Sequence, residues 1–278
     1  MCGPETLRHQ LGGYREYAPP STLARVAEAV WRHRTPLAPR ASVAAHRVIP
    51  DPALSLAFTC VRDAEGRPHE PKLLVVGPIT RTRPFPLEPG FEMAAVKLKL
   101  EWAERLLGVT PSDHADALDD MTDLLPRLAE PLIAALIETR TAEQAVRVLV
   151  QGLAPRAAVL SECQPPLAGR ALDLVRGTSG RVSVERLASC LSVSVRHLRR
   201  VVHRDAAVSL KRFARTVRFI HAVTMADRRT DPAWARLAAE SGYCDQSHLI
   251  REFHALAGTS PRRLYRERRT EAETSNPG

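Results

Sequence analysis

Hydrophobic positions follow two different periods along the chain. Short apolar runs separated by proline and glycine turn signals predict strands at 42–49, 54–61, 72–76 and 93–100. Apolar residues at helical spacing predict helices at 23–31, 101–109, 128–137 and 142–153. Strands followed by helices indicate an α+β N-terminal domain, built from a small β-sheet or barrel plus helices.

Beyond residue 166 every apolar pattern is helical. Residues suited to cap a helix precede six of the periodic runs: Ser183, Ser194, Ser209, Asp231, Asp245 and Ser260. An earlier helix at 167–175 makes seven in this part. The longest, at 210–228, has its apolar seam at Phe213, Val217, Ile220 and Val223. An all-α C-terminal domain is expected at 166–269.

Residues 242–265, GYCDQSHLIREFHALAGTSPRRLY, predict a sharp turn followed by a capped helix. Leu249, Phe253 and Leu256 give that helix one apolar face, and its other face is polar and cationic. This layout is typical of a DNA-binding helix-turn-helix. A related pattern lies upstream, because Leu198 and Leu249 occupy corresponding places at a separation of 51 residues. The repeat predicts two helix-turn-helix units joined by the long helix.

Two such units, with GYCDQSHLIREFHALAGTSP in the second, resemble the DNA-binding domain of the arabinose-operon regulator (AraC) family of bacterial transcription factors. The resemblance covers roughly 166–269. The first unit departs from the family pattern, with Val202 in place of phenylalanine, Ala207 in place of glycine and Leu210 in place of proline. PPSTLARVAEAVW, HRVIPDPALSLAF, VVGPITRTRPF and ERLLGV resemble, more loosely, the N-terminal region of one subgroup of that family.

The charge is unevenly distributed. The net charge of the 278 residues is +9. Residues 161–270 hold 21 Lys and Arg against 10 Asp and Glu, whereas residues 1–160 hold 19 of each. A neutral first part and a basic second part indicate that the second part meets a polyanion, here double-stranded DNA.

The resemblance implies which side chains face bases. In the first recognition helix these are Arg196, Arg199 and Arg200, and in the second they are Gln246, Ser247, His248 and Arg251. Arginine can bond O6 and N7 of guanine together, and glutamine can bond N6 and N7 of adenine. The expected phosphate contacts are His203, Lys211, Arg212, Arg215, Arg262 and Arg263. An arginine-rich solvated face is the alternative interpretation.

Nothing in the pattern indicates catalysis or a cofactor. The five cysteines form no CxxC pair, and His33, His46, His69 and His114 are far apart in sequence. Asp116, Asp119, Asp120 and Asp123 lack the glycine and terminal glutamate of a calcium loop and are expected on a solvated helix face. No nucleophile motif or phosphate-binding glycine loop is present. We therefore expect neither an enzyme nor a bound metal.

Prolines 155, 165 and 166 predict a linker over 154–166, between an N-terminal domain at 1–155 and the DNA-binding domain at 166–269. The absence of a long apolar run and of a signal-peptide core predicts a cytoplasmic protein without a membrane partner. The leading hypothesis is a sequence-specific transcriptional regulator. Its N-terminal domain would bind a small-molecule effector or form a homodimer, and it would contact RNA polymerase if it is an activator. The alternatives are a non-specific architectural DNA-binding protein and a DNA-repair enzyme fused to such a domain.

Overall fold

The computed structural model describes residues 7–11, 13–37, 46–85 and 88–274. Its first part is an antiparallel sheet with strand order β1-β2-β3-β8-β5-β6-β9. The strands are β1 (Leu7–Leu11), β2 (Tyr14–Tyr17), β3 (Ala27–Arg34), β5 (Leu54–Arg62), β6 (Pro68–Val76), β8 (Phe91–Leu98) and β9 (Leu118–Asp120). A separate ribbon pairs β4 (His46–Val48) with β7 (Arg83–Phe85). The expected α+β architecture is confirmed, and part of the strand predicted at 42–49 lies outside the described residues.

One expected helix is a strand. Residues 27–34 form β3, which pairs with β2 on one side and with β8 on the other. A central strand is buried on both faces, so its apolar residues need not alternate. The spacing of Val26, Ala27 and Val30 is therefore compatible with a helix as well as with a strand. Hydrogen bonding to β8 makes this segment a strand.

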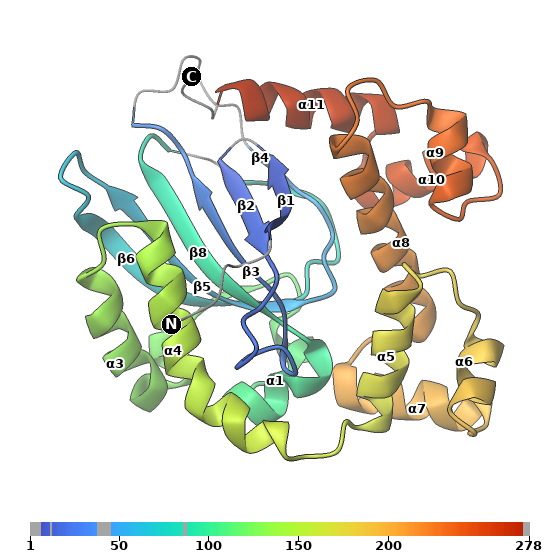
Figure 1. Ribbon diagram of the computed structural model, residues 1–278, viewed down its shortest axis with the longest axis horizontal. Coiled ribbons are helices and arrows are strands. Elements are labelled where there is room, and N and C mark those ends of the chain that lie inside the picture. Colours follow the sequence, from blue (N-terminus) through green and yellow to red (C-terminus); the bar gives the residue numbers. More distant parts are fainter. Residues whose placement is uncertain (1–6, 12, 38–45, 86–87, 275–278) are drawn as a thin grey trace.

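Helices cover one face of this sheet, as Figure 1 shows for α3 and α4. The helices of this part are α1 (Leu100–Leu107), α2 (Met121–Leu124), α3 (Pro126–Ile137) and α4 (Ala142–Ser161), with a 3-10 turn at Pro111–His114. Strand residues at alternate positions, such as Leu56 and Phe58 of β5, share one core with α3 and α4.

The expected linker is mostly helix. α4 continues through Pro155 to Ser161, because Leu153, Ala157 and Leu160 carry its buried stripe onward. Proline costs a helix one backbone hydrogen bond, and here the exposed Pro155 is tolerated while the buried face is kept. The connection to the next helix is reduced to residues 162–166.

The second part is all helical, with α8 as its long central helix (Figure 1). Its helices are α5 (Leu167–Gly177), α6 (Val184–Cys190), α7 (Val195–Ala206), α8 (Leu210–Asp227), α9 (Trp234–Glu240), α10 (Gln246–Ala257) and α11 (Pro261–Thr274). The seven expected helices are present. The Asp231 cap is wrong, because Ala233 is still extended and α9 begins at Trp234, which is buried.

The seam of α8 differs from the expected one. Phe213 and Val223 are buried as expected, but Phe219 is buried where Val217 and Ile220 were expected. Phe219 packs edge-on against Phe253 of α10, with ring centroids 4.9 Å apart. The sequence pattern did not resolve this face, because α8 packs against both helix-turn-helix units and against the sheet-containing part as well.

The first helix-turn-helix unit shares its core with the sheet-containing part. One hydrophobic cluster runs from the strands through Trp102 of α1 to Leu198 of α7 and ends at Phe213. The second unit has its own cluster, from Phe219 to Leu264. Arg176 of α5 strengthens the junction through ion pairs with Glu28 at 2.6 Å and Glu101 at 2.9 Å. The hydrophobic core of the first unit is therefore continuous with that of the sheet-containing part.

Candidate DNA interface and interdomain cavity

The first recognition helix is α7. Ser194 caps it by accepting a hydrogen bond from the backbone N–H of His197 at 3.2 Å. Leu198, Val201 and Val202 are buried beneath it. The four polar residues expected on its outer face, Arg196, Arg199, Arg200 and His203, are all exposed. The outer face of α7 thus has the composition of a DNA-contacting surface.

The second recognition helix is α10. Asp245 caps it, and its carboxylate accepts from the backbone N–H of His248 at 2.6 Å. Gln246, Ser247 and Arg251 are exposed. The half-buried His248 ring packs edge-on against Tyr243, with centroids 5.2 Å apart. Tyr243 therefore restricts the orientation of His248, which the sequence pattern alone did not indicate.

Most of the expected phosphate contacts lie exposed near the starts of α8 and α11. Lys211, Arg212 and Arg262 are exposed there, and Arg263 is exposed while paired with Glu267 at 3.0 Å. Arg215 differs, because its Nε lies 2.6 Å from Glu252 of α10. This ion pair joins α8 to the second recognition helix, so Arg215 has a positioning contact that the sequence analysis missed.

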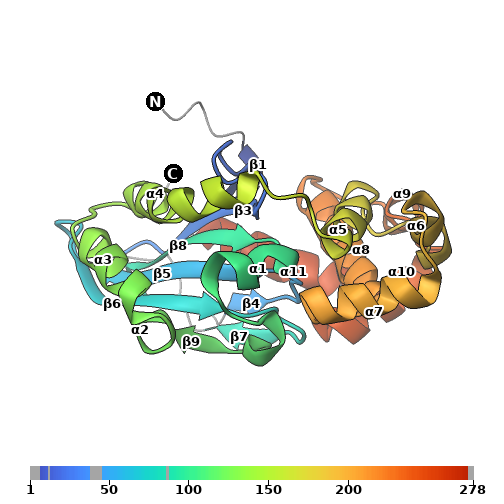
Figure 2. The same ribbon diagram turned by 90° about the horizontal axis from the view of Figure 1, so that it is seen from below.

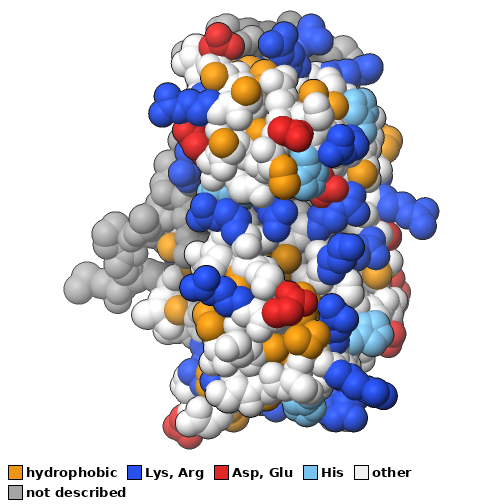
Figure 3. All heavy atoms as spheres, turned by 90° about the vertical axis from the view of Figure 1, so that its right-hand side faces the viewer, with side chains coloured by type: hydrophobic (Ala, Val, Ile, Leu, Met, Phe, Trp, Pro, Cys, Tyr) orange, Lys and Arg blue, Asp and Glu red, His pale blue; other side chains and the backbone are white. Residues whose placement is uncertain are grey.

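The two recognition helices lie on the same side of the helical part. In Figure 2, α7 and α10 follow one margin, opposite α5 and α6. Figure 3 views this end of the molecule and shows Lys and Arg side chains spread over its whole length, with fewer acidic ones between them. A surface of this sign and extent suits the phosphate backbone of a duplex.

A cavity of about 670 Å³ lies between the sheet, the β4–β7 ribbon and α8. Its sheet wall is made by alternate residues of β2, β3 and β8, which project from the face opposite α3 and α4. These are Tyr14, Glu16, Trp31, His33, Phe91, Met93 and Lys97. The second part of the chain closes the cavity with Ile220, Val223 and Thr224 of α8. The volume is within the range of sites for small organic molecules.

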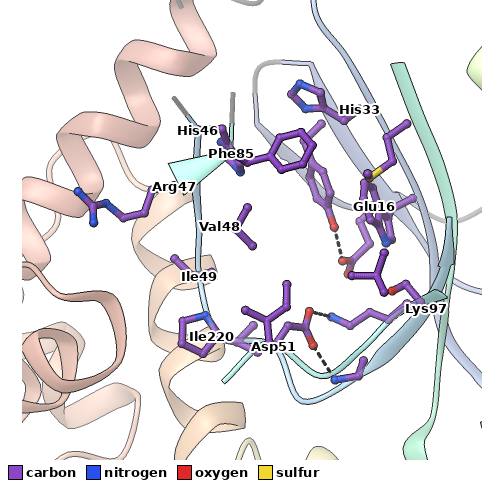
Figure 4. A pocket seen from close by; sticks show the side chains of 18 of the residues that line it. Glu16, His33, His46, Arg47, Val48, Ile49, Asp51, Phe85, Lys97 and Ile220 are labelled. Atoms are coloured by element: carbon purple, nitrogen blue, oxygen red, sulfur yellow. Dashed lines mark hydrogen bonds and ion pairs between the residues drawn. The ribbon is translucent and has the colours of Figure 1, made fainter. Parts of the chain in front are cut away.

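Polar groups of the cavity form short contacts (Figure 4). Lys97 Nζ lies 2.5 Å from Asp51 Oδ2, and the Tyr14 hydroxyl donates to Glu16 at 2.6 Å. Burial alone would lower the pKa of Lys97, but the carboxylates of Asp51 and Glu16 outweigh burial and raise it. Burial, followed by the charge of Glu16, raises the pKa of Tyr14. Lys97 is therefore charged and Tyr14 neutral at physiological pH.

Two histidines that are distant in sequence meet at the cavity wall. The rings of His33 and His46 have centroids 6.1 Å apart. Burial, followed by the charge of His46, lowers the pKa of His33 to about 4. His33 is thus a neutral ring at physiological pH.

The β4–β7 ribbon connects the cavity to the second recognition helix. His46 and Val48 line the cavity, while Arg47 between them extends away from it (Figure 4). Arg47 pairs with Glu267 of α11 at 2.7 Å and donates to the carbonyl of Ala257 at 3.4 Å. Thr82, just before β7, donates to the carbonyl of Leu256 at 2.8 Å. The ribbon thereby supplies donors to the carbonyl end of α10, which the helix itself leaves unsatisfied.

The four aspartates considered for a calcium loop do not share a helix face, contrary to expectation. Asp116 accepts from the backbone N–H of Thr80, Asp119 contacts His114, and Asp120 caps α2. Within the described ranges no group of three or more His, Cys, Asp or Glu is placed to hold a metal ion. In the same ranges no helix is long and apolar enough to span a membrane.

Family profiles match both parts of the chain. Residues 187–268 match a helix-turn-helix domain family, and this span contains both recognition helices with α8 between them. Residues 187–268 therefore form a helix-turn-helix domain of the AraC type. The protein is a DNA-binding transcriptional regulator. Residues 15–118 match a domain of unknown function.

Several solved structures are distantly similar to this chain. The C-terminal domain of AraT, a response regulator from Geobacillus stearothermophilus, is 22% identical, with a TM-score of 0.34, over 36% of this chain and 84% of that one. ToxT from Vibrio cholerae is 8% identical, with a TM-score of 0.43, over 85% of this chain and 96% of that one. Wild-type ToxT with unsaturated fatty acid bound is 11% identical, with a TM-score of 0.44, over 85% and 95%. No curated protein matches the chain.

The sequence analysis found the recognition helices but not the cavity. The cavity residues come from eight strands, β2 to β9, from α8 and α11, and from the segments between them. The only local signal was period-two alternation in the strands, for example Met93, Ala95 and Lys97, which marks one sheet face without saying what covers it.

Proposed function

We propose that this regulator binds one asymmetric promoter site with both recognition helices, and that a small molecule in the interdomain cavity controls this binding. The observation that carries the first half is the pair of capped recognition helices, α7 and α10, on one side of a shared central helix. α8 has 18 residues and so spans about 27 Å. This is close to the roughly 34 Å between successive major-groove faces of a duplex.

The two recognition faces differ, which favours sequence-specific binding over architectural binding. The α7 face presents Arg196, Arg199 and Arg200, whereas the α10 face presents Gln246, Ser247 and Arg251. A non-specific binder needs only charge, so it has no use for two unlike sets of base-reading groups. We expect each helix to select a different block of bases.

The test is selection of DNA fragments by the full chain, followed by footprinting at physiological salt. Arg196→Ala and Arg251→Ala should each weaken binding to the selected site by about 1–3 kcal/mol and relax the base preference in one block only. Arg147→Ala, an exposed arginine on α4, is the matched control and should leave both unchanged. Uniform coverage of the DNA, or an unchanged selected sequence in both variants, would contradict the proposal.

The second half rests on where the cavity lies. A molecule filling it would contact Ile220 and Thr224 of α8, the helix that separates the two recognition helices. It would also contact Val48, next to the Arg47 that holds the carbonyl end of α10. A shift of β4 therefore changes the support of the second recognition helix directly.

Hydrogen exchange of the free protein tests this connection. Arg47→Ala should speed exchange at the end of α10 and the start of α11, because it removes both the ion pair to Glu267 and the donor to Ala257. Arg263→Ala is the control: it also loses a contact with Glu267, but within α11 and on the exposed surface. Equal effects of the two substitutions would contradict a specific role for the ribbon.

Homodimer formation through the N-terminal domain and contact with RNA polymerase remain part of the hypothesis. Two copies joined at their sheet-containing parts would occupy two asymmetric sites on the same DNA. Footprints of two repeated blocks, together with a dimer in sedimentation, are the expected result if the chain pairs in this way.

A further inference from the structure

The cavity wall formed by β2 and β3 combines a carboxylate with aromatic rings. Glu16 and Trp31 are direct partners in the β2–β3 ladder. Tyr14, two residues before Glu16 on the same strand, has its ring centroid 5.5 Å from that of Trp31. All three residues line the cavity. The ladder therefore presents an acidic group and two electron-rich rings from adjacent positions.

Glu16 has a neutral hydrogen-bond partner. Its carboxylate accepts from the hydroxyl of Tyr14 at 2.6 Å, and in the described part of the chain it forms no ion pair. The nearby Lys97 is already paired with Asp51 at 2.5 Å. Two carboxylates thus share one ammonium in this part of the cavity, which leaves a net negative charge beside the two rings.

The other charged groups of the lining lie on other elements, so the excess is local to the wall beside Glu16. Arg268 of α11 pairs with the buried Asp227 at 2.7 Å, and Arg47 pairs with Glu267 outside the cavity. Arg83 of β7 donates to the carbonyl of Asp116 at 3.0 Å, and Arg228 lies just after the end of α8. His33 is neutral at physiological pH, as shown above, so it adds no positive charge.

The remaining wall is apolar and large enough for an organic body. Val48, Ile49, Phe85, Met93 and Ile220 line the volume of about 670 Å³, and Figure 4 shows Val48 and Phe85 facing into it. Apolar lining with a few placed polar groups is the usual composition of a small-molecule site. The face of an aromatic ring attracts a cation within about 6 Å, and the attraction is stronger when water is excluded.

We propose that the effector of this cavity is an organic cation, with an ammonium group held by Glu16, Tyr14 and Trp31 and an apolar or aromatic body against β4, β7 and α8. The inference rests on the proposed effector role of the cavity and names the chemistry of that effector. The ammonium supplies the ion-pair partner that Glu16 does not have among the described residues, and the faces of the Tyr14 and Trp31 rings attract its charge.

Calorimetric titration of the full chain without DNA tests the proposal. Three benzyl compounds are compared: benzyltrimethylammonium, its uncharged carbon isostere neopentylbenzene, and the anion phenylacetate. The cation should bind at least about tenfold more tightly than the isostere. Glu16→Gln keeps an acceptor for Tyr14 and should weaken cation binding about tenfold without changing binding of the isostere. Glu104→Gln, an exposed glutamate on α1, is the control and should leave all affinities unchanged.

Three results would overturn the inference: tighter binding of phenylacetate than of the cation, equal binding of the cation to the Glu16→Gln and native proteins, or no cation binding at millimolar concentration. Thermal unfolding of the Glu16→Gln protein verifies that it is folded. The footprint of the ligand-free chain separates this inference from the proposed function. A specific footprint with an anion-preferring cavity refutes only the effector chemistry, whereas a cation-selective cavity without a specific footprint refutes only the DNA-binding proposal.

Discussion

The end of the first recognition helix offers a substitution with a matched counterpart in the same chain. Ala207 follows α7 with φ 53° and ψ 25°, in the left-handed region. Gly258 follows α10 with φ 65° and ψ 14° and occupies the corresponding place in the repeat. The same turn is therefore made once with a Cβ atom and once without. We predict that Ala207→Gly stabilises the first unit and that Gly258→Ala destabilises the second.

The magnitude follows from two opposing terms. Holding a residue with a Cβ in the left-handed region costs about 1–2 kcal/mol. Replacing alanine by glycine relieves this cost, but glycine has more conformational freedom in the unfolded chain, which offsets about 0.4–1 kcal/mol of the gain in stability. Ala207→Gly should therefore raise the free energy of unfolding by about 0.5–1 kcal/mol. A Cβ placed on Gly258 would meet no atom within 4 Å, so the reverse substitution should cost a similar amount from the backbone alone.

Native-state hydrogen exchange resolves the two units within the full chain. A change of 0.5–1 kcal/mol alters exchange about two- to fivefold. Amides of α7 should exchange more slowly by this factor in Ala207→Gly, and amides of α10 more quickly in Gly258→Ala. Ala235→Gly, at an exposed position inside α9, is the control and should be destabilising, because glycine weakens a helix interior.

Faster or unchanged exchange of α7 in Ala207→Gly would refute the reasoning. It would mean that contacts of the Ala207 methyl group outweigh the cost of its backbone conformation. An unaffected α10 in Gly258→Ala would refute it independently, because no contact of the new methyl group is available there to compensate.

Three further predictions concern DNA binding and pH. Inserting about 5 bp between the two blocks of the selected site turns one block to the opposite face of the duplex, so footprinting should find binding near the non-specific level; indifference to the insertion would show that the units do not bind as one rigid pair. Arg262→Ala should weaken binding to every sequence alike and reduce the salt slope by about 1, measured by titration in increasing salt; a sequence-dependent loss would assign Arg262 to bases instead. The pKa of His33 is lowered to about 4 in the folded chain, so between about pH 6.5 and pH 4 the unfolded chain binds a proton at His33 that the folded chain does not bind. Stability should therefore fall by about 2–3 kcal/mol more for the native protein than for His33→Gln when urea unfolding is compared at pH 7 and pH 4.5, and parallel losses would exclude His33 as the cause.

The helical part was predictable to a large extent, because its signals are local. Serine and aspartate caps such as Ser194 and Asp245 lie next to the helices they start, and the apolar faces of α7 and α10 repeat within each helix. The exceptions have tertiary causes. Phe219 is buried in place of Ile220 because both helix-turn-helix units and the sheet-containing part pack against α8. Arg215 forms an ion pair with Glu252, which belongs to another helix. Direct base contacts of the seven named side chains stay a prediction.

The sheet-containing part was predictable only in outline. Its α+β class was evident from the strand and helix patterns. However, the sequence analysis predicted a helix where β3 lies and a linker where α4 ends. In both places the deciding contacts are distant in sequence, as in the pairing of β3 with β8. The proximity of His33 and His46 has the same origin. β4 belongs to a separate ribbon, and only the tertiary structure places that ribbon next to β3.

The sequence by itself determined the two recognition helices, the capped turns before them, the basic second half and the helix-turn-helix family of that half. Periodicity, capping and charge act over a few residues, so they can be recognised without knowing the fold. The tertiary structure alone decided the cavity, the placement of Glu16 beside Tyr14 and Trp31, and the contact of Arg47 with the end of α10. These features join elements separated by more than two hundred residues, because burial and ion pairing depend on distance in space and leave no periodic pattern along the chain.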